Sequence, residues 1–295
     1  MPQPPRDRKD HYLPQGYLRG FIDPERANNA RPLWCLNKRR NLWERKSPKQ
    51  ICHLVGMYDF SNDSIEAEHA DVTFKSMEDG LRHLRDALLQ REFADWQEHI
   101  GFLLPYMQMI RVRSLQFFVE QGQAVADSFI GRVTSVDEVS RKITYDASQP
   151  LTEDEVHDGT LTKMREEFLK GSAWMADFHW QFRTTQNPYN PVVTSEQPLF
   201  VKGEKTQTER SMTMDILTDA ATEVYFPFCW RACLVGRVEP FSTDVEPFEQ
   251  FDLEELRHMV AKMAPEYVIS PQIVEGLKLD GRPLPGVLTR GWLPT

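Results

Sequence analysis

The sequence has few cysteines and no long hydrophobic run. Its four cysteines include no Cys-x-x-Cys pair, so neither a zinc site nor a disulfide framework is indicated, and we expect reduced, mostly buried thiols. No apolar segment approaches the roughly 20 residues that a membrane-spanning helix needs. The polar, Pro-rich start lacks the apolar segment of a secretory signal. We therefore expect a cytoplasmic protein with no membrane partner.

The strong catalytic motifs are also missing. The sequence contains no P-loop, no Gly-x-Gly-x-x-Gly, no His-Glu-x-x-His and no Gly-x-Ser-x-Gly. Interpretations as an ATPase, a dinucleotide-dependent dehydrogenase or a zinc protease therefore have little support. These absences leave open catalysis by residues that are scattered along the chain.

What is present is a globular composition with an uneven charge. The chain has 295 residues, of which 40% are hydrophobic and 27% are charged. Its net charge is −9, yet residues 1–50 hold twelve Lys or Arg against five Asp or Glu, which leaves −16 on the remainder. A basic segment on an acidic body can bind phosphate or pair within the molecule, and the larger acidic surplus favours pairing.

The order of the predicted elements indicates an α+β fold, with long helices packed on a mostly antiparallel C-terminal sheet. Apolar residues recur at helical spacing over 64–93 and again over 93–129, where Pro105 predicts a kink or break near Leu104. Alternating and short apolar runs after residue 178 predict strands. Helices first and antiparallel strands later argue against a parallel sheet. The predicted elements are, in order, a short helix over 13–21, a hairpin over 33–46, the two long helices, a polar loop or short strands over 135–149, a helix over 152–170, strands over 178–184, 191–194, 199–201, 224–228 and 232–238, a helix over 251–263 and a strand over 267–270.

We divide the chain into a flexible lead-in over 1–10, a single α+β domain over 11–275 and a Pro- and Gly-rich tail over 276–295. The sequence contains no internal repeat that would suggest a different division. A chain of this length can bury a large core as one or two domains.

The most concentrated set of chemically useful residues lies over 11–21. His11 precedes a short amphipathic helix that begins with Pro14 and carries Tyr17 and Arg19. An imidazole titrates near neutral pH, so His11 can act as a general base or a metal ligand. A capping or core histidine is the ordinary alternative.

Later segments supply further candidates. Glu66 lies at the start of the helix over 64–93 and shares a face with His69, a spacing that can bind a metal, although an acid in a first helical turn is common. Gln108 and Arg111 share a face of an apolar helix, where Arg111 needs an anionic partner, either a protein carboxylate or a ligand. Ser195 and Glu196 interrupt a strand in a polar turn.

These residues and their neighbours resemble the motifs of a mainly prokaryotic family, the domain-of-unknown-function family numbered 4238. The resemblance covers roughly residues 11 to 270. Its signature is similar to the following positions: His11, Tyr12, Pro14, Tyr17, Leu18 and Phe21; Trp34 to Lys38; Ile65 and Glu66; Gln108 and Arg111; Thr194, Ser195, Glu196 and Pro198; Phe226, Pro227 and Phe228.

The resemblance implies one shared polar set, made of His11, Glu66, Gln108, Arg111, Ser195 and Glu196. It implies no activity. The sequence departs from the family pattern twice: Thr73 stands near the place of a second acid, and Glu196 replaces an Asp. The first departure weakens any mechanism that needs two carboxylates on that helix.

Two hypotheses follow. The first is a metal-dependent hydrolase of phosphodiesters or nucleic acid, with catalytic His11, Glu66, Arg111 and Glu196, and with His11, Glu66 and Glu196 holding Mg²⁺ or Mn²⁺. Tyr17, Arg19, Gln108 and Ser195 would contact the nucleic acid or another anionic ligand. The second is a non-enzymatic binding or regulatory module in which the same polar set is a buried structural network.

Overall fold

The computed structural model describes residues 9–58, 65–137, 142–146, 150–203 and 222–277. The expected lead-in therefore lies outside the described residues up to position 8, and the expected tail does so from position 278. Lys9 and Asp10 belong to the first strand.

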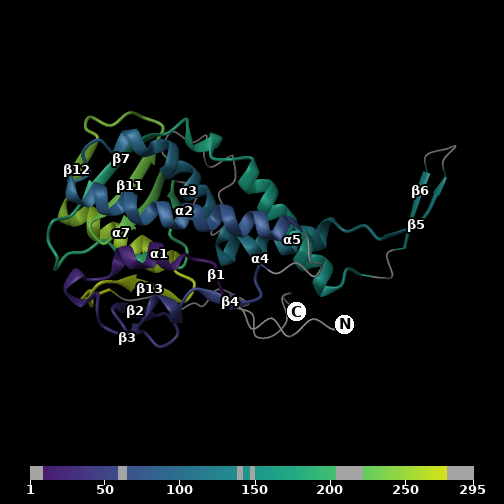
Figure 1. Ribbon diagram of the computed structural model, residues 1–295, viewed down its shortest axis with the longest axis horizontal. Coiled ribbons are helices and arrows are strands. Elements are labelled where there is room, and N and C mark those ends of the chain that lie inside the picture. Colours follow the sequence, from purple (N-terminus) through teal and green to yellow (C-terminus); the bar gives the residue numbers. More distant parts are fainter. Residues whose placement is uncertain (1–8, 59–64, 138–141, 147–149, 204–221, 278–295) are drawn as a thin grey trace.

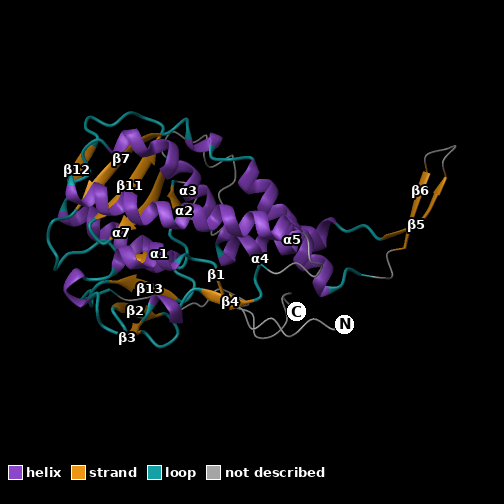
Figure 2. Ribbon diagram, in the orientation of Figure 1, coloured by secondary structure: helices purple, strands orange, loops and turns teal. Residues whose placement is uncertain are grey.

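The described elements follow the predicted order (Figures 1 and 2). The helices are α1 (Gln15–Leu18), α2 (Ile65–Gln90), α3 (Ile100–Arg113), α4 (Leu115–Ser128), α5 (Glu153–Leu169) and α7 (Gln250–Met263). The strands are β1 (Lys9–His11), β2 (Leu33–Asn37), β3 (Leu42–Lys46), β4 (His53–Val55), β5 (Arg132–Asp137), β6 (Lys142–Asp146), β7 (His179–Thr184), β8 (Thr194–Ser195), β9 (Phe200–Lys202), β10 (Glu223–Cys229), β11 (Ala232–Arg237), β12 (Val245–Pro247) and β13 (Tyr267–Ser270). The α+β class is confirmed.

Two sheets form the body. The C-terminal strands make a five-stranded sheet in the order β12-β7-β11-β10-β9, which is antiparallel except where β12 runs parallel to β7. A second, four-stranded sheet has the order β3-β2-β13-β8. The sequence predicted the β2–β3 hairpin, but not that it pairs with β13 from the other end of the chain. That pairing depends on which distant segments meet in the folded chain, and the local periodicity of the sequence does not indicate it.

Tyr17 joins the two sheets. Its hydroxyl lies 2.8 Å from Thr194 Oγ1 in β8 of the four-stranded sheet, and it donates a hydrogen bond to the Pro227 carbonyl in β10 of the five-stranded sheet. Its ring lies 5.6 Å from the ring of Phe226. The side chain is completely buried. The short α1 therefore lies between the two sheets, and its Tyr17 holds them together.

The long helix expected over 93–129 breaks at Ser114 and not at Leu104. α3 runs through Pro105, whereas Ser114 adopts an extended backbone with ψ 144° and accepts a hydrogen bond from the Phe117 N–H. A serine in this conformation caps the next helix, so α4 starts in a new direction. Because Pro105 sits in the second turn of α3, it removes a hydrogen bond near the helix start without ending the helix.

The loop after α2 places aromatic rings on the sheet. Phe93 has a left-handed φ of 64° and is buried, with its ring 4.8 Å from Phe182. Trp96 packs edge-on against the same ring at 5.4 Å. A left-handed backbone is costly for a bulky residue, so this packing must hold the loop in place.

α4 and α5 form an arm that extends away from the two sheets (Figure 1). Gly122 of α4 approaches Thr160 of α5 so closely that an added Cβ would lie 3.3 Å from the threonine hydroxyl. Among the described residues, no helix has both the length and the apolar character that a membrane crossing demands. All four cysteines are buried and unbridged, as predicted.

Candidate functional site

His11 lies in β1, where its main chain and ring contact different neighbours. Its Nδ1 lies 3.5 Å from Gln15 Nε2, and its ring centroid is 5.4 Å from that of His53. Its carbonyl oxygen accepts a hydrogen bond from Arg113 Nη2. His11 therefore belongs to a group of contacts centred on Arg113.

Arg113 is the residue that sequence reasoning missed. It is buried, donates to Glu78 Oε1 through Nη1, and donates to the Tyr58 hydroxyl at 3.2 Å through Nε. Burial alone would lower the pKa of Arg113, but Tyr58 and Glu78 outweigh it and raise that pKa. Nothing in the local sequence distinguishes Arg113 from Arg111, because its carboxylate partner lies 35 positions earlier in the chain.

Glu196 is an anchor between strands. Its Oε2 accepts hydrogen bonds from the main-chain N–H groups of Glu266 at 2.7 Å and Tyr267 at 2.8 Å. Burial raises the pKa of Glu196 to about 8, although the two N–H groups act in the opposite direction. Ser195, next to it, bonds locally through its hydroxyl to the Gln197 carbonyl at 3.1 Å. Ser195 and Glu196 are therefore both engaged in contacts at the end of β8, and those of Glu196 reach the start of β13.

The two binding residues predicted near the start of the chain do not lie on one common surface. Tyr17 is buried in the contacts that join the sheets, whereas Arg19 is exposed on the next turn. The helical spacing between them already places them on different faces. A ligand at the surface could reach Arg19 but not the Tyr17 hydroxyl.

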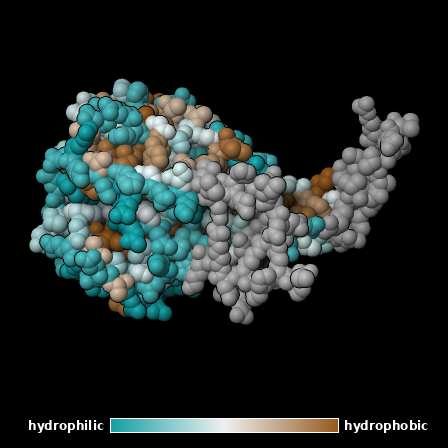
Figure 3. Space-filling model, in the orientation of Figure 1, coloured by the Kyte–Doolittle hydropathy of each residue, from teal (hydrophilic) through white to brown (hydrophobic). Residues whose placement is uncertain are grey.

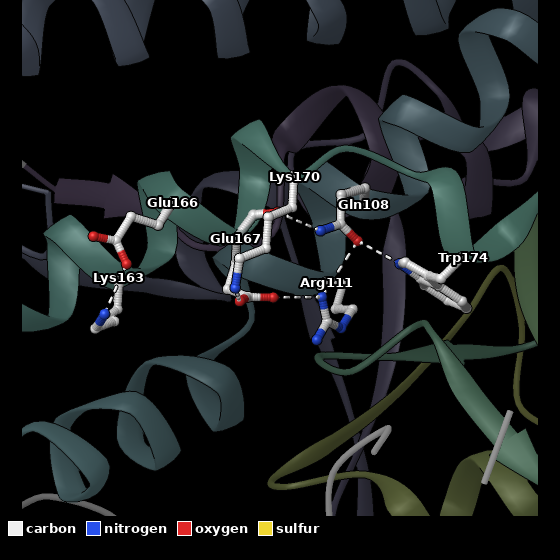
Figure 4. A network of polar contacts seen from close by, with 7 residues as sticks. All are labelled: Gln108, Arg111, Lys163, Glu166, Glu167, Lys170 and Trp174. Atoms are coloured by element: carbon white, nitrogen blue, oxygen red, sulfur yellow. Dashed lines mark hydrogen bonds and ion pairs between the residues drawn. The ribbon is translucent and has the colours of Figure 1, made fainter. Parts of the chain in front are cut away.

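Gln108 and Arg111 do come together (Figure 4). Gln108 Nε2 donates to the Glu167 carbonyl at 2.8 Å, and its Oε1 accepts from Trp174 Nε1 at 3.1 Å and from Arg111 Nη1 at 3.3 Å. The side chain of Gln108 is thus engaged in holding α3 against α5 and the segment that follows it. The guanidinium carbon of Arg111 lies 5.1 Å from the centroid of the Phe117 ring, and this contact helps to hold the guanidinium in place.

A small pocket opens beside Arg111, between the α3–α4 junction and the segment after β8. Its volume is about 140 Å³. The lining residues are Arg111, Ser114, Gln116, Phe117, Glu120, Gln121, Gln197 and Leu199. Gln197 directly follows the predicted Ser195 and Glu196, so the pocket joins two of the segments that the sequence singled out. Those two side chains do not line it.

The guanidinium of Arg111 is only partly neutralised. Its Nη1 lies 3.7 Å from Glu167 Oε2, and the same carboxylate also pairs with Lys170. Burial lowers the pKa of Arg111, and Glu167 partly offsets this effect. The pocket also contains the first turn of α4, and a helix N-terminus carries partial positive charge.

The described contacts therefore divide the predicted polar set. His11 lies in the group around Arg113, Ser195 and Glu196 lie at the end of β8, and Gln108 and Arg111 lie between α3 and α5. Glu66 belongs to α2, but its side chain lies outside the described residues. Among the side chains that are described, no group of three His, Cys, Asp or Glu residues could hold a metal ion. The Mg²⁺ or Mn²⁺ hydrolase stays a prediction.

Comparison with known proteins places the chain in a family. Residues 9–272 match the family described as a protein of unknown function, DUF4238. The chain belongs to the DUF4238 family. The resemblance inferred from the order of the motifs is thereby confirmed, over nearly the span expected. No curated protein and no solved structure shows a significant match to this DUF4238 chain.

Proposed function

We propose that this DUF4238 chain is a non-enzymatic binding module that holds a small carboxylate-bearing ligand in the Arg111 pocket. The observation that carries the proposal is the placement of Arg111, whose guanidinium is fixed on Phe117 and lines the pocket. An arginine held in place loses little conformational entropy when it binds a carboxylate. The other predicted residues with described side-chain bonds are engaged in holding the fold together.

The charge around the pocket favours an anion. Arg111 shares Glu167 with Lys170, so its remaining N–H groups can bind a second carboxylate. The first turn of α4, which includes Gln116 and Phe117, adds partial positive charge. The pocket volume of about 140 Å³ lies below the roughly 300 Å³ at which drug-sized pockets begin, so the ligand is small.

The remaining lining residues favour a ligand that also carries an amino group. Glu120 contributes a carboxylate to the pocket and accepts a hydrogen bond from Gln116 Nε2 at 2.8 Å. The buried Oε1 of Gln197 has no hydrogen-bond partner within the described part of the chain. Both oxygens are acceptors, which suits an ammonium donor. A small amino acid, with one carboxylate and one ammonium group, matches these requirements.

Replacing Arg111 with Gln is expected to weaken ligand binding strongly without unfolding the protein. A hydrogen bond to a charged group contributes about 1.5–3 kcal/mol, so affinity should fall roughly 10- to 100-fold. Calorimetric titration with acetate, glycine, alanine and glutamate, together with thermal-shift measurements, tests this expectation. The wild-type chain should be stabilised by at least one amino acid.

Two further variants are needed to interpret the titration. Arg82→Gln removes the same charge from an exposed position on α2 and should bind like the wild type. Glu120→Gln should weaken amino acids more than acetate if the ammonium group is recognised there. Equal binding by Arg111→Gln and the wild type, or no binding by either, would rule the proposal out.

The basic β2–β3 hairpin supports a second candidate function, the binding of single-stranded nucleic acid. Residues 31–49 hold seven Lys or Arg and one Glu. Arg45 lies 4.8 Å over the Trp34 ring, and Arg39 is exposed in the turn. Bases stack on aromatic rings and guanidinium planes, while basic residues contact phosphates. Glu44 neutralises part of this charge through Arg40 and Lys46.

The double variant Arg39→Ala/Arg45→Ala is expected to weaken binding of a labelled single-stranded oligonucleotide. Each lost phosphate contact reduces the slope of log affinity against log salt by about 0.7, so two lost contacts reduce it by about 1.4. Fluorescence anisotropy at several salt concentrations measures the slope. Arg82→Ala/Arg91→Ala, with the same loss of charge on and just after α2, should leave the slope unchanged. Identical slopes for both double variants would exclude the hairpin.

A further inference from the structure

A larger pocket, which we call the α7 pocket, lies along helix α7. Its volume is about 630 Å³. One wall is a single face of α7, made of residues that lie three or four positions apart: Gln250, Glu254, Arg257 and His258. The other wall includes the segment 272–277, which follows β13. A pocket of this size falls within the roughly 300–1,000 Å³ that small-molecule sites occupy.

The electrostatic environment of Arg257 differs from that of the other buried arginines. Arg85, Arg113 and Arg257 are the arginines that are buried in the described part of the chain. Arg113 pairs with the Glu78 carboxylate, and Arg85 Nε lies 3.8 Å from that of Asp86. Arg257 has no carboxylate at ion-pair distance among the described residues. A buried charge without a counter-charge is costly, so an anion from outside the chain would stabilise Arg257.

The hydrogen bonds of Arg257 leave one end of its guanidinium available. Nε and Nη2 both donate to the Pro191 carbonyl, at 3.0 and 2.7 Å, and they hold a side chain that is only 6% exposed. Nη1 has no hydrogen-bond partner within the described residues. Burial lowers the pKa of Arg257 to about 10, although Glu254 acts in the opposite direction. A bound anion would favour the charged guanidinium and so counteract the effect of burial.

The charges around the α7 pocket favour a carboxylate over a phosphate. Glu254 and Glu275 also line the pocket, and Glu254 Oε1 accepts a hydrogen bond from Gln250 Nε2 at 2.5 Å. Two acids beside one arginine repel a phosphate group, with its charge of nearly −2, more than a carboxylate with a charge of −1. One available nitrogen of Arg257 also suits a carboxylate better than the three oxygens of a phosphate.

Other lining residues provide contacts for an apolar group. Val274 and Leu277 are buried residues of the lining, whereas Tyr189 and Ile273 are 85% and 45% exposed. On the face of the molecule seen in Figure 3, hydrophobic residues appear as separate patches within a largely hydrophilic surface. Large apolar side chains that are exposed beside a pocket are a feature of ligand-binding grooves. An aromatic ring of the ligand can pack against the exposed ring of Tyr189.

We propose that the α7 pocket binds a small aromatic carboxylate, with the carboxylate on Arg257 and the ring against Tyr189 and Ile273. The ligand supplies the counter-charge that Arg257 lacks and covers apolar side chains that are otherwise exposed. This is a second site, on α7, and it does not depend on the amino acid proposed for the Arg111 pocket on α3.

Ligand-detected NMR with 3-phenylpropionate and its neutral amide, 3-phenylpropanamide, tests the proposal. The two compounds have nearly the same shape and differ in charge. The wild-type chain should bind the acid with a Kd on the order of 1 mM. The amide should bind roughly 10-fold more weakly or worse, because it lacks the charge that Arg257 recognises. Equal binding of the two compounds, or no binding of the acid at about 10 mM, would overturn the proposal.

Gln272→Glu tests the position of the ligand without removing Arg257, whose bonds to Pro191 help to hold the fold. The substitution keeps the shape of a lining side chain and adds a negative charge to the pocket. It should weaken the acid several-fold and leave the amide unchanged. Gln97→Glu makes the same change at an exposed position outside the lining and should bind both compounds like the wild type. Acid binding that Gln272→Glu leaves intact, or that Arg111→Gln abolishes instead, would contradict this placement.

Tyr189→Ser tests the contact with the ring of the ligand. The acid and the amide carry the same ring, so this variant should weaken both several-fold. Phe251→Ser removes another exposed ring, on α7 but outside the lining, and should change neither affinity. Wild-type binding of both compounds by Tyr189→Ser would show that the ligand does not occupy the α7 pocket as proposed.

Discussion

Glu196→Gln is expected to make the folded protein progressively more stable than the wild type as the pH rises from 5 to 8. Burial raises the pKa of the folded Glu196 carboxyl from 4.5 to about 8. Between these two pH values the folded chain keeps a proton that the unfolded chain releases. Each pH unit in this window therefore favours unfolding of the wild type, and the effect ends once the folded carboxyl has also ionised near pH 8.

The expected effect is large. One unit of pKa difference corresponds to about 1.4 kcal/mol, so the wild type loses roughly 3–4 kcal/mol of stability relative to the Glu196→Gln variant across this pH window. The amide oxygen of the introduced glutamine can still accept the N–H groups of Glu266 and Tyr267. Any difference in stability between the two side chains that does not depend on pH would change the free energy of unfolding by the same amount at pH 5 and at pH 8. The informative quantity is therefore the slope of the stability difference between wild type and variant against pH.

Urea unfolding at half-unit steps from about pH 5 to pH 9 measures this slope. Glu98→Gln removes an exposed carboxylate and serves as the control, which should follow the wild type within about 0.5 kcal/mol. Parallel curves for wild type and Glu196→Gln would show that Glu196 ionises normally in the folded chain. The interpretation of Glu196 as a buried anchor would then be wrong.

Arg113→Met is expected to destabilise the protein by about 3–5 kcal/mol, the usual cost of breaking a buried charged pair by removing one partner. Arg113 ties three segments together, since it bonds to the His11 carbonyl in β1, to Glu78 in α2 and to the Tyr58 hydroxyl. Its guanidinium also lies 5.0 Å over the Phe74 ring. Methionine retains much of the side-chain length but none of these hydrogen bonds.

Equilibrium unfolding in urea at neutral pH measures the loss. Arg82→Met makes the same substitution at an exposed position of α2 and should change stability by less than about 0.5 kcal/mol. A double-mutant cycle with Glu78→Gln isolates the pair from the other contacts. If Arg113→Met is as stable as Arg82→Met, the network around His11 does not hold the N-terminal strand in place.

Local features of the fold could be predicted because they depend on neighbouring residues. The helix start at Thr152 is one example: its Oγ1 accepts from the Glu155 N–H at 3.2 Å, and the Glu155 carboxylate accepts from the Thr152 N–H at 2.8 Å. The acids after Thr152 already indicate this start. The order of the family motifs also identified DUF4238. In contrast, Pro105 suggested a kink or break near Leu104, whereas α3 continues through Pro105 and the chain leaves the helix at Ser114.

The candidate site could be predicted only in part. Spacing along α3 showed that Gln108 and Arg111 share a face, and they do contact each other. It could not show that Gln197 completes their pocket, or that Arg113 and not Arg111 binds close to His11.

The amino-acid sequence by itself determined the α+β class, most helix and strand positions and the membership of the family, because periodicity, caps and motif order are written in nearby residues. Only the tertiary structure decided the partners of Glu196, the joining of the two sheets by Tyr17 and the pocket beside Arg111. Each of these depends on main-chain or side-chain groups from distant segments. Burial then gives those groups properties, such as the raised pKa of Glu196, that the same residues lack in an unfolded chain.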